Sequence, residues 1–433
     1  MLTFVSRFKK SKVMNIKRNP IFWMLSWVVL LFFLSCGDDH IEELMVPKRN
    51  ILLYIATDAD AAIDGDTPEK IDIIRAGWTP GQGEMLMYVD RRGQEALLFR
   101  MNSILTEGKY GLDTLANYGV ENSADAAVLS RMIDTLLSYP ADRYGLIFFS
   151  HASGWLPEGA LKDPQLTELN LPQSERLVPN EEAGTRSLVI DNGGDRRHEM
   201  EYYDFAEAIP DHQLDFIILE ACLMADVMSM YVLRNKAEYV LASSAEIVSP
   251  GFSYIYRSDI MRLYDTKNSV ESVVSGFAQA FHDYIVTRFA ENNARCSSTL
   301  GLIKMSEMQN LATVVKAALN NQELDETTVV IDSIQQFDRP EAHISKPPKK
   351  SRYFDLDHVI ENLASASQYA AFCTQMEKTV VWKAQTESFF IGSGGSNGFY
   401  IKRHSGLTTY IKQDVYPALN AVYESSAWYK QLY

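Results

Sequence analysis

Two residues able to do nucleophilic and acid–base chemistry stand directly after two apolar segments of the sequence. Residues 144–150 (YGLIFFS) end at His151, and residues 214–221 (LDFIILEA) end at Cys222. Short apolar runs of this kind are typical of strands buried on both faces of a parallel sheet. Ligands of such sheets bind beyond the carboxyl ends of the strands. If the two strands are neighbours, the thiol and the imidazole converge in one crevice, as a thiol nucleophile and its base require.

Two physical effects would activate a thiol in this position. We expect a helix over residues 223–233 to begin directly at Cys222, and the positive end of a helix lowers the pKa of a thiol. The imidazole would accept or share the thiol proton, and backbone N–H groups at the helix start and after His151 could hold an oxyanion. The alternative that spacing alone leaves open is an inert buried Cys and a structurally hydrogen-bonded His.

The elements that must position these residues follow an alternating pattern. Besides the two strands above, apolar segments rich in β-forming residues occupy 51–57, 84–90 and 239–243. A helix is expected between Ser123 as its N-cap and Pro140, because apolar residues fall on one of its faces. A second amphipathic helix is expected over 270–285. Strands alternating with helices predict an α/β fold with helices on both faces of a mostly parallel sheet.

The chain begins with a segment that indicates export. Residues 1–35 contain six basic and no acidic residues, and 21–34 are an apolar run of 14 residues, shorter than the roughly 20 that span a bilayer as a helix. We interpret 1–35 as a signal peptide, with an uncleaved anchor as the alternative. The LSCG sequence around Cys36 resembles a bacterial lipobox, which would make Cys36 the lipid-modified N-terminus. The acidic pair at 38–39 looks like a surface-targeting signal, so we expect an outer-membrane lipoprotein displayed on the cell surface.

Composition and charge exclude several classes of protein. The chain is 46% hydrophobic and 22% charged, which is typical of a globular protein and not of a disordered one. The 56 acidic residues outnumber the 41 basic ones, which argues against a nucleic-acid binder. Without the basic residues of the leader the balance is 35 basic against 56 acidic, a net charge of −21. Once Cys36 is assigned to lipid, three cysteines remain, so at least one thiol is expected to be free.

The motifs around His151 and Cys222 resemble those of the clostripain family of cysteine peptidases, relatives of caspases, gingipains and legumain. That family has His-Gly-Ser-Gly-Trp and Asp-Ala-Cys-Leu-Met after its strands, and this chain has HASGW at 151–155 and EACLM at 220–224. The resemblance implies a caspase-like three-layer α/β sandwich. It also implies that His151 is the general base and acid and Cys222 the nucleophile, so that peptide hydrolysis passes through a thioester acyl-enzyme.

Two departures from the family pattern concern the expected site. Ala152 replaces a glycine whose backbone N–H is expected, with that of Cys222, to form the oxyanion hole, and Ala fits only if the position does not demand a positive φ. Glu220 replaces the Asp that faces a basic P1 side chain in the family. We therefore expect cleavage after Arg or Lys, with Glu220, Ser243 and Ser244 as candidates for the S1 pocket. Glu220 as an ordinary strand-end carboxylate is the alternative.

The resemblance also suggests a division of the chain. We expect a tether at 36–49, a catalytic domain at 50–265 and a smaller C-terminal α+β accessory region at 266–433. Residues 156–197 are rich in Pro, Gly and polar residues, which predicts an exposed excursion. Relatives are often processed by their own activity between the His and the Cys, and the candidate cut sites here are Lys162, Arg176 and Arg186.

The sequence also bears on metals and partners. Asp58 and Asp60 belong to an acidic stretch (DADAAIDGD) that is reminiscent of a calcium loop, but its spacing departs from the EF-hand pattern. The alternative is an Asp-rich turn. We expect the chemistry to need no cofactor, with Ca²⁺ possible, and we expect a monomer that acts on peptides or proteins. The competing functions are a catalytically inactive surface-binding lipoprotein of the same fold and a hydrolase of small esters or amides.

Overall fold

Nine strands form the central sheet of the structure, a computed structural model that describes residues 47–58, 61–157, 160, 190–191, 198–338, 350–390 and 398–433. The five strands at its centre are parallel and lie in the order β9-β8-β5-β1-β2. They are the five strands expected from the sequence, namely β1 (Arg49–Ala56), β2 (Met85–Asp90), β5 (Arg143–Ser150), β8 (Leu214–Glu220) and β9 (Ala237–Ser243).

Two pairs of antiparallel strands extend this sheet at its edges. The hairpin of β3 (Ala96–Thr106) and β4 (Lys109–Gly119) continues from β2, while β10 (Thr299–Lys304) and β12 (Val380–Gln385) continue from β9. We did not predict the hairpin. Its outer half is exposed and its ladder has three register shifts, so neither a continuous apolar run nor a clean alternation marks it in the sequence.

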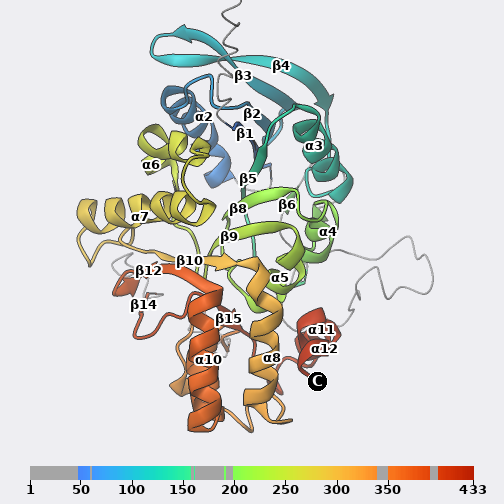
Figure 1. The fold of residues 1–433 in the computed structure, drawn as a ribbon, viewed down its shortest axis with the longest axis vertical. Helices are drawn as coiled ribbons and strands as arrows, with labels where there is room; N and C mark the ends of the chain where they lie inside the picture. Colours follow the sequence, from blue (N-terminus) through green and yellow to red (C-terminus); the bar gives the residue numbers. More distant parts are fainter. Residues whose placement is uncertain are drawn as a thin grey trace, which may run out of the picture. The chain divides into compact units, whose positions relative to one another are not determined.

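Helices cover both faces of the sheet, as Figure 1 shows. One face carries α2 (Ala61–Gly77), α6 (Ser253–Asp259) and α7 (Val270–Arg288). The other carries α3 (Ala126–Ser138), α4 (Tyr202–Glu207) and α5 (Val227–Val232). Alternate residues of β1 enter the two cores, and every residue of this strand is buried. The predicted three-layer α/β sandwich is confirmed.

The start of α3 differs from the prediction. Its N-cap is Asp125, whose side chain accepts the Ala127 N–H at 2.9 Å, and not Ser123. Ser123 is fully buried, and its carbonyl accepts the Tyr54 hydroxyl at 2.7 Å. The predicted apolar stripe of this helix is buried as expected, since the stripe, and not the cap, decides which face packs on the sheet.

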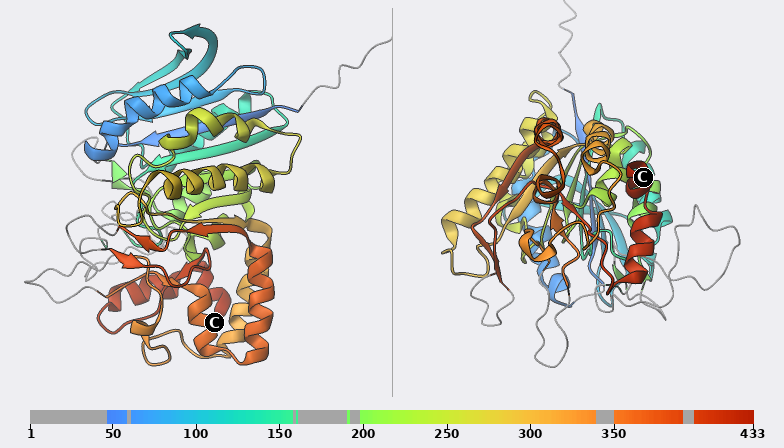
Figure 2. Two further views of the ribbon diagram at one scale, coloured as in Figure 1. Left: turned by 90° about the vertical axis from the view of Figure 1, so that its left-hand side faces the viewer. Right: turned by 90° about the horizontal axis from the view of Figure 1, so that it is seen from below.

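Most of the chain after β10 lies below the sheet in the left view of Figure 2 and forms an α+β region, whereas α7, β10 and β12, which the predicted division at residue 265 assigned to it, belong to the central sheet and its helical layer. Three antiparallel strand pairs and several short 3-10 helices complete the described elements of the whole chain; one of the pairs and two of these helices precede β10. The helices of this region are α8 (Met308–Leu319), α9 (Leu356–Leu363), α10 (Ala366–Thr379), α11 (Pro417–Ser425) and α12 (Ala427–Leu432). The strand pairs are β6 (Ile190–Asp191) with β7 (His198–Glu199), β11 (Phe354–Asp355) with β15 (Thr408–Thr409), and β13 (Ser388–Phe389) with β14 (Phe399–Tyr400). The 3-10 helices are η2 (Leu233–Asn235), η3 (Ile260–Tyr264), η4 (Met305–Glu307) and η5 (Ile331–Ser333).

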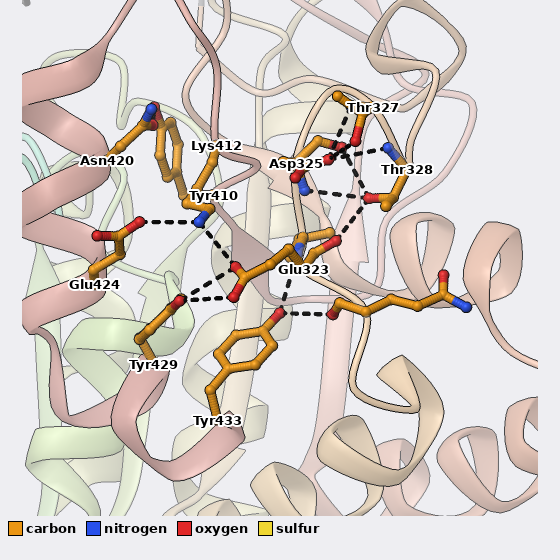
Figure 3. A network of polar contacts seen from close by, with 12 residues as sticks. Glu323, Asp325, Thr327, Thr328, Tyr410, Lys412, Asn420, Glu424, Tyr429 and Tyr433 are labelled. Atoms are coloured by element: carbon orange, nitrogen blue, oxygen red, sulfur yellow. Dashed lines mark hydrogen bonds and ion pairs between the residues drawn. The ribbon is translucent and has the colours of Figure 1, made fainter.

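A polar network joins the segment after α8 to the last two helices (Figure 3). The Lys412 ammonium lies 2.9 Å from a carboxylate oxygen of Glu323 and 2.9 Å from one of Glu424. The Tyr429 hydroxyl donates to Glu323 at 3.0 Å, and the Tyr433 hydroxyl donates to the Gln322 carbonyl at 3.1 Å. These contacts fix the C-terminus against the body of the region.

Candidate active site

The two sequence motifs leave the sheet side by side. Strands β5 and β8 are parallel neighbours, and Phe149 lies opposite Glu220 in their register. His151 and Cys222 each follow this pair by two residues. Both residues border one pocket at the carboxyl ends of the strands. The predicted convergence of the imidazole and the thiol is therefore what the structure shows.

Three segments of the chain line this pocket. The first is the start of α2, and the second consists of the ends of β5 and β8 with the residues that follow them. The third is the loop between β9 and α6. The lining residues are Ile63, Asp66, Phe149, Ser150, His151, Glu220, Ala221, Cys222, Ile247, Ser249, Pro250 and Gly251. The site therefore depends on α2, an element that we did not predict from the sequence.

Cys222 is half-buried and forms no disulfide. Its sulfur accepts the backbone N–H of Ile247 at 3.4 Å. The next residue, Leu223, has a φ of +62°, a left-handed conformation that is uncommon for a residue with a side chain and is typical of strained functional turns. The Leu223 N–H donates to the Ala245 carbonyl at 2.9 Å, and the Ala225 N–H donates to Ser243 at 3.0 Å. These bonds hold the turn that presents the thiol.

The expected helix start at Cys222 is wrong. Helix α5 begins at Val227, and its N-cap is Asp226, whose carboxylate accepts the Ser229 N–H at 2.9 Å and the Ser229 hydroxyl at 2.6 Å. A right-handed helix cannot run through the left-handed Leu223, so it cannot begin at Cys222. Because the field of a helix end falls off within its first turn, it does not act on the thiol as we expected.

Burial dominates the electrostatics of Asp226. The carboxyl is fully buried and has no cation beside it among the described residues, so desolvation raises its pKa from 3.8 to about 7, although the bonds from Ser229 act in the opposite direction. Such a group is protonated at mildly acidic pH in the folded chain.

The glycine that the His151 turn requires is Gly154. Its φ is +56°, and a side-chain carbon at this position would lie 2.5 Å from the Leu223 carbonyl oxygen and 3.0 Å from an Asp226 oxygen. Ala152 is buried and is not among the described residues with a positive φ. An alanine therefore fits the position at which the family has glycine. The close contact between the turns of the two motifs is at Gly154 and not at Ala152.

Residues from the C-terminal region support both turns from behind. The Tyr353 hydroxyl donates to the Ser153 carbonyl, and the Thr408 N–H donates to the Ala225 carbonyl at 2.8 Å. The ring of Trp155 packs 4.6 Å from that of Tyr410. No described residue after 251 lines the pocket, so this region supports the site without forming its wall.

Glu220 is already paired inside the protein. The Lys70 ammonium, from α2, lies 2.6 Å from one Glu220 oxygen, and both side chains are at most 1% exposed. The same carboxylate accepts the Phe252 N–H at 2.6 Å and the Tyr256 hydroxyl at 2.7 Å. Lys70 also donates to the Pro250 carbonyl at 3.2 Å and lies 4.0 Å from the Phe149 ring centroid. Burial lowers the pKa of Lys70, and the Glu220 charge opposes that shift.

Ser243 and Ser244, the other S1 candidates, do not reach the pocket lining. Both are buried; Ser243 bonds to the Thr299 hydroxyl at 2.9 Å, and Ser244 lies 3.1 Å from the Nε2 of His404. Their role in the S1 pocket stays a prediction without a contact that supports it.

Other predicted residues lie in different surroundings. Asp58 is 7% exposed at the end of β1, and the stretch after it begins α2 instead of a loop. Across the residues that the structure describes, no three Asp, Glu, His or Cys side chains are grouped to hold a metal ion. No helix in the described ranges is both long and apolar enough to cross a membrane. Cys36, Asp60, Lys162, Arg176 and Arg186 lie outside the described residues.

Sequence reasoning missed Lys70 and Asp66. The available signal was the spacing in α2, where Lys70 falls three residues after Thr67 and four before Ile74, on the stripe that faces the sheet. A lysine on a buried stripe requires an acidic partner. The partner is 150 positions away, so the sequence alone does not identify it.

Comparison with known proteins gives a consistent answer. The model of the clostripain family matches residues 67–167 and 176–432. The fold is similar to an inactive zymogen C11 protease from Parabacteroides distasonis, at 26% identity and a TM-score of 0.70, over 89% of this chain and 99% of that one. It is also similar to a secreted C11 cysteine protease from Bacteroides thetaiotaomicron solved with an irreversible peptide inhibitor, at 23% identity and a TM-score of 0.71, over 89% and 98% of the two chains.

Comparison with curated proteins found no match. The family model nevertheless covers far more than half of the sequence, including both motifs. The two similar structures match this fold over 99% and 98% of their own chains. On this evidence the chain belongs to the clostripain family and is a cysteine peptidase of that family.

Proposed function

We propose that the chain cleaves peptide bonds with Cys222 as nucleophile and His151 as general base and acid. The observation that carries the proposal is that both side chains border one pocket at the ends of adjacent parallel strands. The strained turn at Leu223 supports it, because such turns persist where the surrounding structure holds a functional group in place.

The proposed reaction has two halves. The thiol of Cys222 gives its proton to His151, and the sulfur bonds to the carbonyl carbon of the scissile peptide. The resulting oxyanion is held by the backbone N–H groups of Ala152 and Cys222. The C–N bond then breaks, and the imidazolium protonates the departing amine. In the second half, a water gives a proton to His151 and attacks the thioester, which releases the acid product and restores the thiol.

Peptides with Arg or Lys at P1 are the proposed substrate class. Among the described residues that line the pocket, Asp66 and Glu220 are acidic and none is Arg or Lys. The chain as a whole carries 56 acidic against 41 basic residues, and this excess attracts basic peptides at low salt. The reaction needs no cofactor, and Ca²⁺ stays a prediction to be tested by adding a chelator.

Self-processing between His151 and Cys222 is part of the proposal. A similar structure is described as an inactive zymogen, which supports a processed form in this chain as well. The candidate sites are Lys162, Arg176 and Arg186. The wild-type chain is expected to show an internal nick that Cys222→Ala abolishes. A nick that persists in the variant means that another protease made it.

We also propose that the mature chain is anchored by lipid at Cys36 and displayed on the cell surface as a monomer. A similar protein is described as secreted, which supports export. Protease treatment of intact cells is expected to shorten the protein. A protein that stays intact on whole cells, and is cut only after lysis, contradicts surface display.

The test of the proposed function uses fluorogenic Arg and Lys peptides with and without a thiol alkylator. The wild-type chain is expected to turn them over and to lose activity on alkylation, and Cys222→Ala is expected to be inactive. Cys373→Ala is the matched control, because Cys373 is the other half-buried thiol of the described chain. Absence of thiol-sensitive turnover across a broad peptide library would favour the second candidate, an inactive binding protein, for which the replaced glycine at Ala152 is the supporting observation.

A further inference from the structure

The predicted specificity carboxylate, Glu220, is not available to a substrate. Its side chain is 1% exposed and already accepts three donors, one from the Lys70 ammonium, one from the Phe252 backbone and one from the Tyr256 hydroxyl. The loop closes over it at Gly251, where an added side-chain carbon would lie 2.3 Å from a Glu220 oxygen. A basic side chain would have to displace a buried ammonium to reach it, and removing one partner from a buried pair is strongly unfavourable.

The second acidic residue of the pocket has different surroundings. Asp66 lies on α2, one helical turn before Lys70, and is half-buried at the pocket lining. One of its oxygens accepts the hydroxyl of Ser249 from the opposite loop. No Lys, Arg or His among the described residues forms an ion pair with it. A carboxylate offers about four acceptor positions, so its other oxygen can receive a guanidinium or an ammonium.

The two carboxylates of the pocket therefore have different roles: Glu220 is paired inside the protein, and Asp66 is accessible to a substrate. The Lys70–Glu220 pair carries no net charge. Asp66 also interacts with Lys70 through its charge but forms no ion pair among the described residues, so the three groups together leave one net negative charge at the pocket. We propose that Asp66, and not Glu220, selects the basic P1 side chain. This inference rests on the proposed peptidase function. Lys70 donates to both Glu220 and the Pro250 carbonyl, so the buried pair contacts the loop that carries Ser249.

The test compares kcat/KM of the full chain for peptides with Arg, Lys or norleucine at P1. Asp66→Asn is expected to reduce kcat/KM for Arg and Lys about tenfold, the effect of losing one charge-assisted hydrogen bond, and to leave norleucine turnover unchanged. Asp66→Glu keeps the charge and is expected to retain most of the preference. Glu69→Gln, an exposed acid on the same helix that does not line the pocket, is the matched control and is expected to change nothing.

A double variant separates Asp66 from Glu220. Lys70→Met with Glu220→Gln removes both charges of the buried pair together, so it avoids leaving either one alone. The double variant is expected to keep the preference for basic P1 residues. If it loses that preference while Asp66→Asn keeps it, Glu220 is the selector and the inference is wrong. A wild-type chain that is active but does not prefer basic residues also overturns it, whereas a wild-type chain without any thiol-dependent turnover overturns the proposed function first.

Discussion

At the scale of single residues, the buried pair of Lys70 and Glu220 makes the sharpest prediction about stability. Each side chain is buried, and each forms with the other the only ion pair that the structure shows for it within the described chain. Glu220→Gln or Lys70→Met alone is expected to cost about 3–5 kcal/mol of unfolding free energy, because it strands a buried charge. The double variant is expected to lose much less than the sum of the two. Urea unfolding measures all three, and strictly additive losses contradict the pairing.

Gly154, the glycine of the His151 motif, provides a second prediction at this scale. Gly154→Ala forces a side chain into a left-handed backbone and into the Leu223 carbonyl, so it is expected to lower both the midpoint of thermal unfolding and peptidase activity. The left-handed conformation alone costs roughly 1–2 kcal/mol for a residue with a side chain. Ala152→Gly is the matched control, and its fold is expected to be unaffected. The reading of the motif is wrong if Ala152→Gly is the more damaging of the two.

Single residues also show what the sequence could and could not reveal about the site. His151 and Cys222 could be identified because each directly follows an apolar strand, and parallel neighbours bring such positions together. The pairing of Glu220 with Lys70 could not, because nothing local to either residue indicates a partner 150 positions away. In the sequence, Asp66 belongs to the acidic stretch that is reminiscent of a calcium loop, because nothing there indicates that α2 starts at Ala61.

At the scale of elements, the start of α5 predicts a pH dependence. Burial raises the pKa of its N-cap, Asp226, from 3.8 to about 7. Between about pH 4 and pH 7 the Asp226 carboxyl keeps its proton in the folded chain but has released it in the unfolded chain. The contribution of this group to the unfolding free energy is therefore full below about pH 4 and is lost as pH rises through 7. The shift corresponds to roughly 4 kcal/mol at 1.36 kcal/mol per pH unit.

Asp226→Asn keeps an N-cap side chain but removes the titration. As pH rises from 4.5 to 7.5, the unfolding free energy of Asp226→Asn is expected to increase relative to that of the wild type. The matched control is Asp125→Asn, which changes the exposed N-cap of α3 and is expected to follow the wild-type pH profile. Parallel profiles for wild type and Asp226→Asn contradict the assignment.

The strands and helices that could be predicted are those in which burial requires a regular pattern of apolar residues in the sequence. The five central strands and helices α3 and α7 were expected because both faces of a strand, or one face of a helix, must be apolar. Helix α2 was missed because its stripe includes Thr67 and Lys70 and its interior contains Pro68. The start of α5 was placed too early because a left-handed residue such as Leu223 has no sequence signal.

At the scale of the whole molecule, the C-terminal region contacts the strands and turns that carry His151 and Cys222. Strand β10 pairs with β9, and Tyr353 and Thr408 bond to the turns that follow His151 and Cys222. The division of the chain at residue 265 stays a prediction, and these contacts oppose independent folding of the first part. A chain of residues 47–265 is expected to lack cooperative unfolding, whereas residues 47–433 are expected to fold. Circular dichroism during thermal unfolding compares them, and a cooperative transition in the shorter chain contradicts this dependence.

The central claim is that the Cys222 sulfur attacks the substrate with the help of His151. The most direct measurement treats the full chain with a peptide that carries a basic P1 residue and a thiol-reactive group, and then locates the adduct by mass spectrometry. We expect one adduct on Cys222 in the wild-type chain, none in Cys222→Ala and a strongly slowed reaction in His151→Ala. An adduct on Cys373 instead, or labelling of Cys222 that proceeds equally fast in His151→Ala, would contradict it.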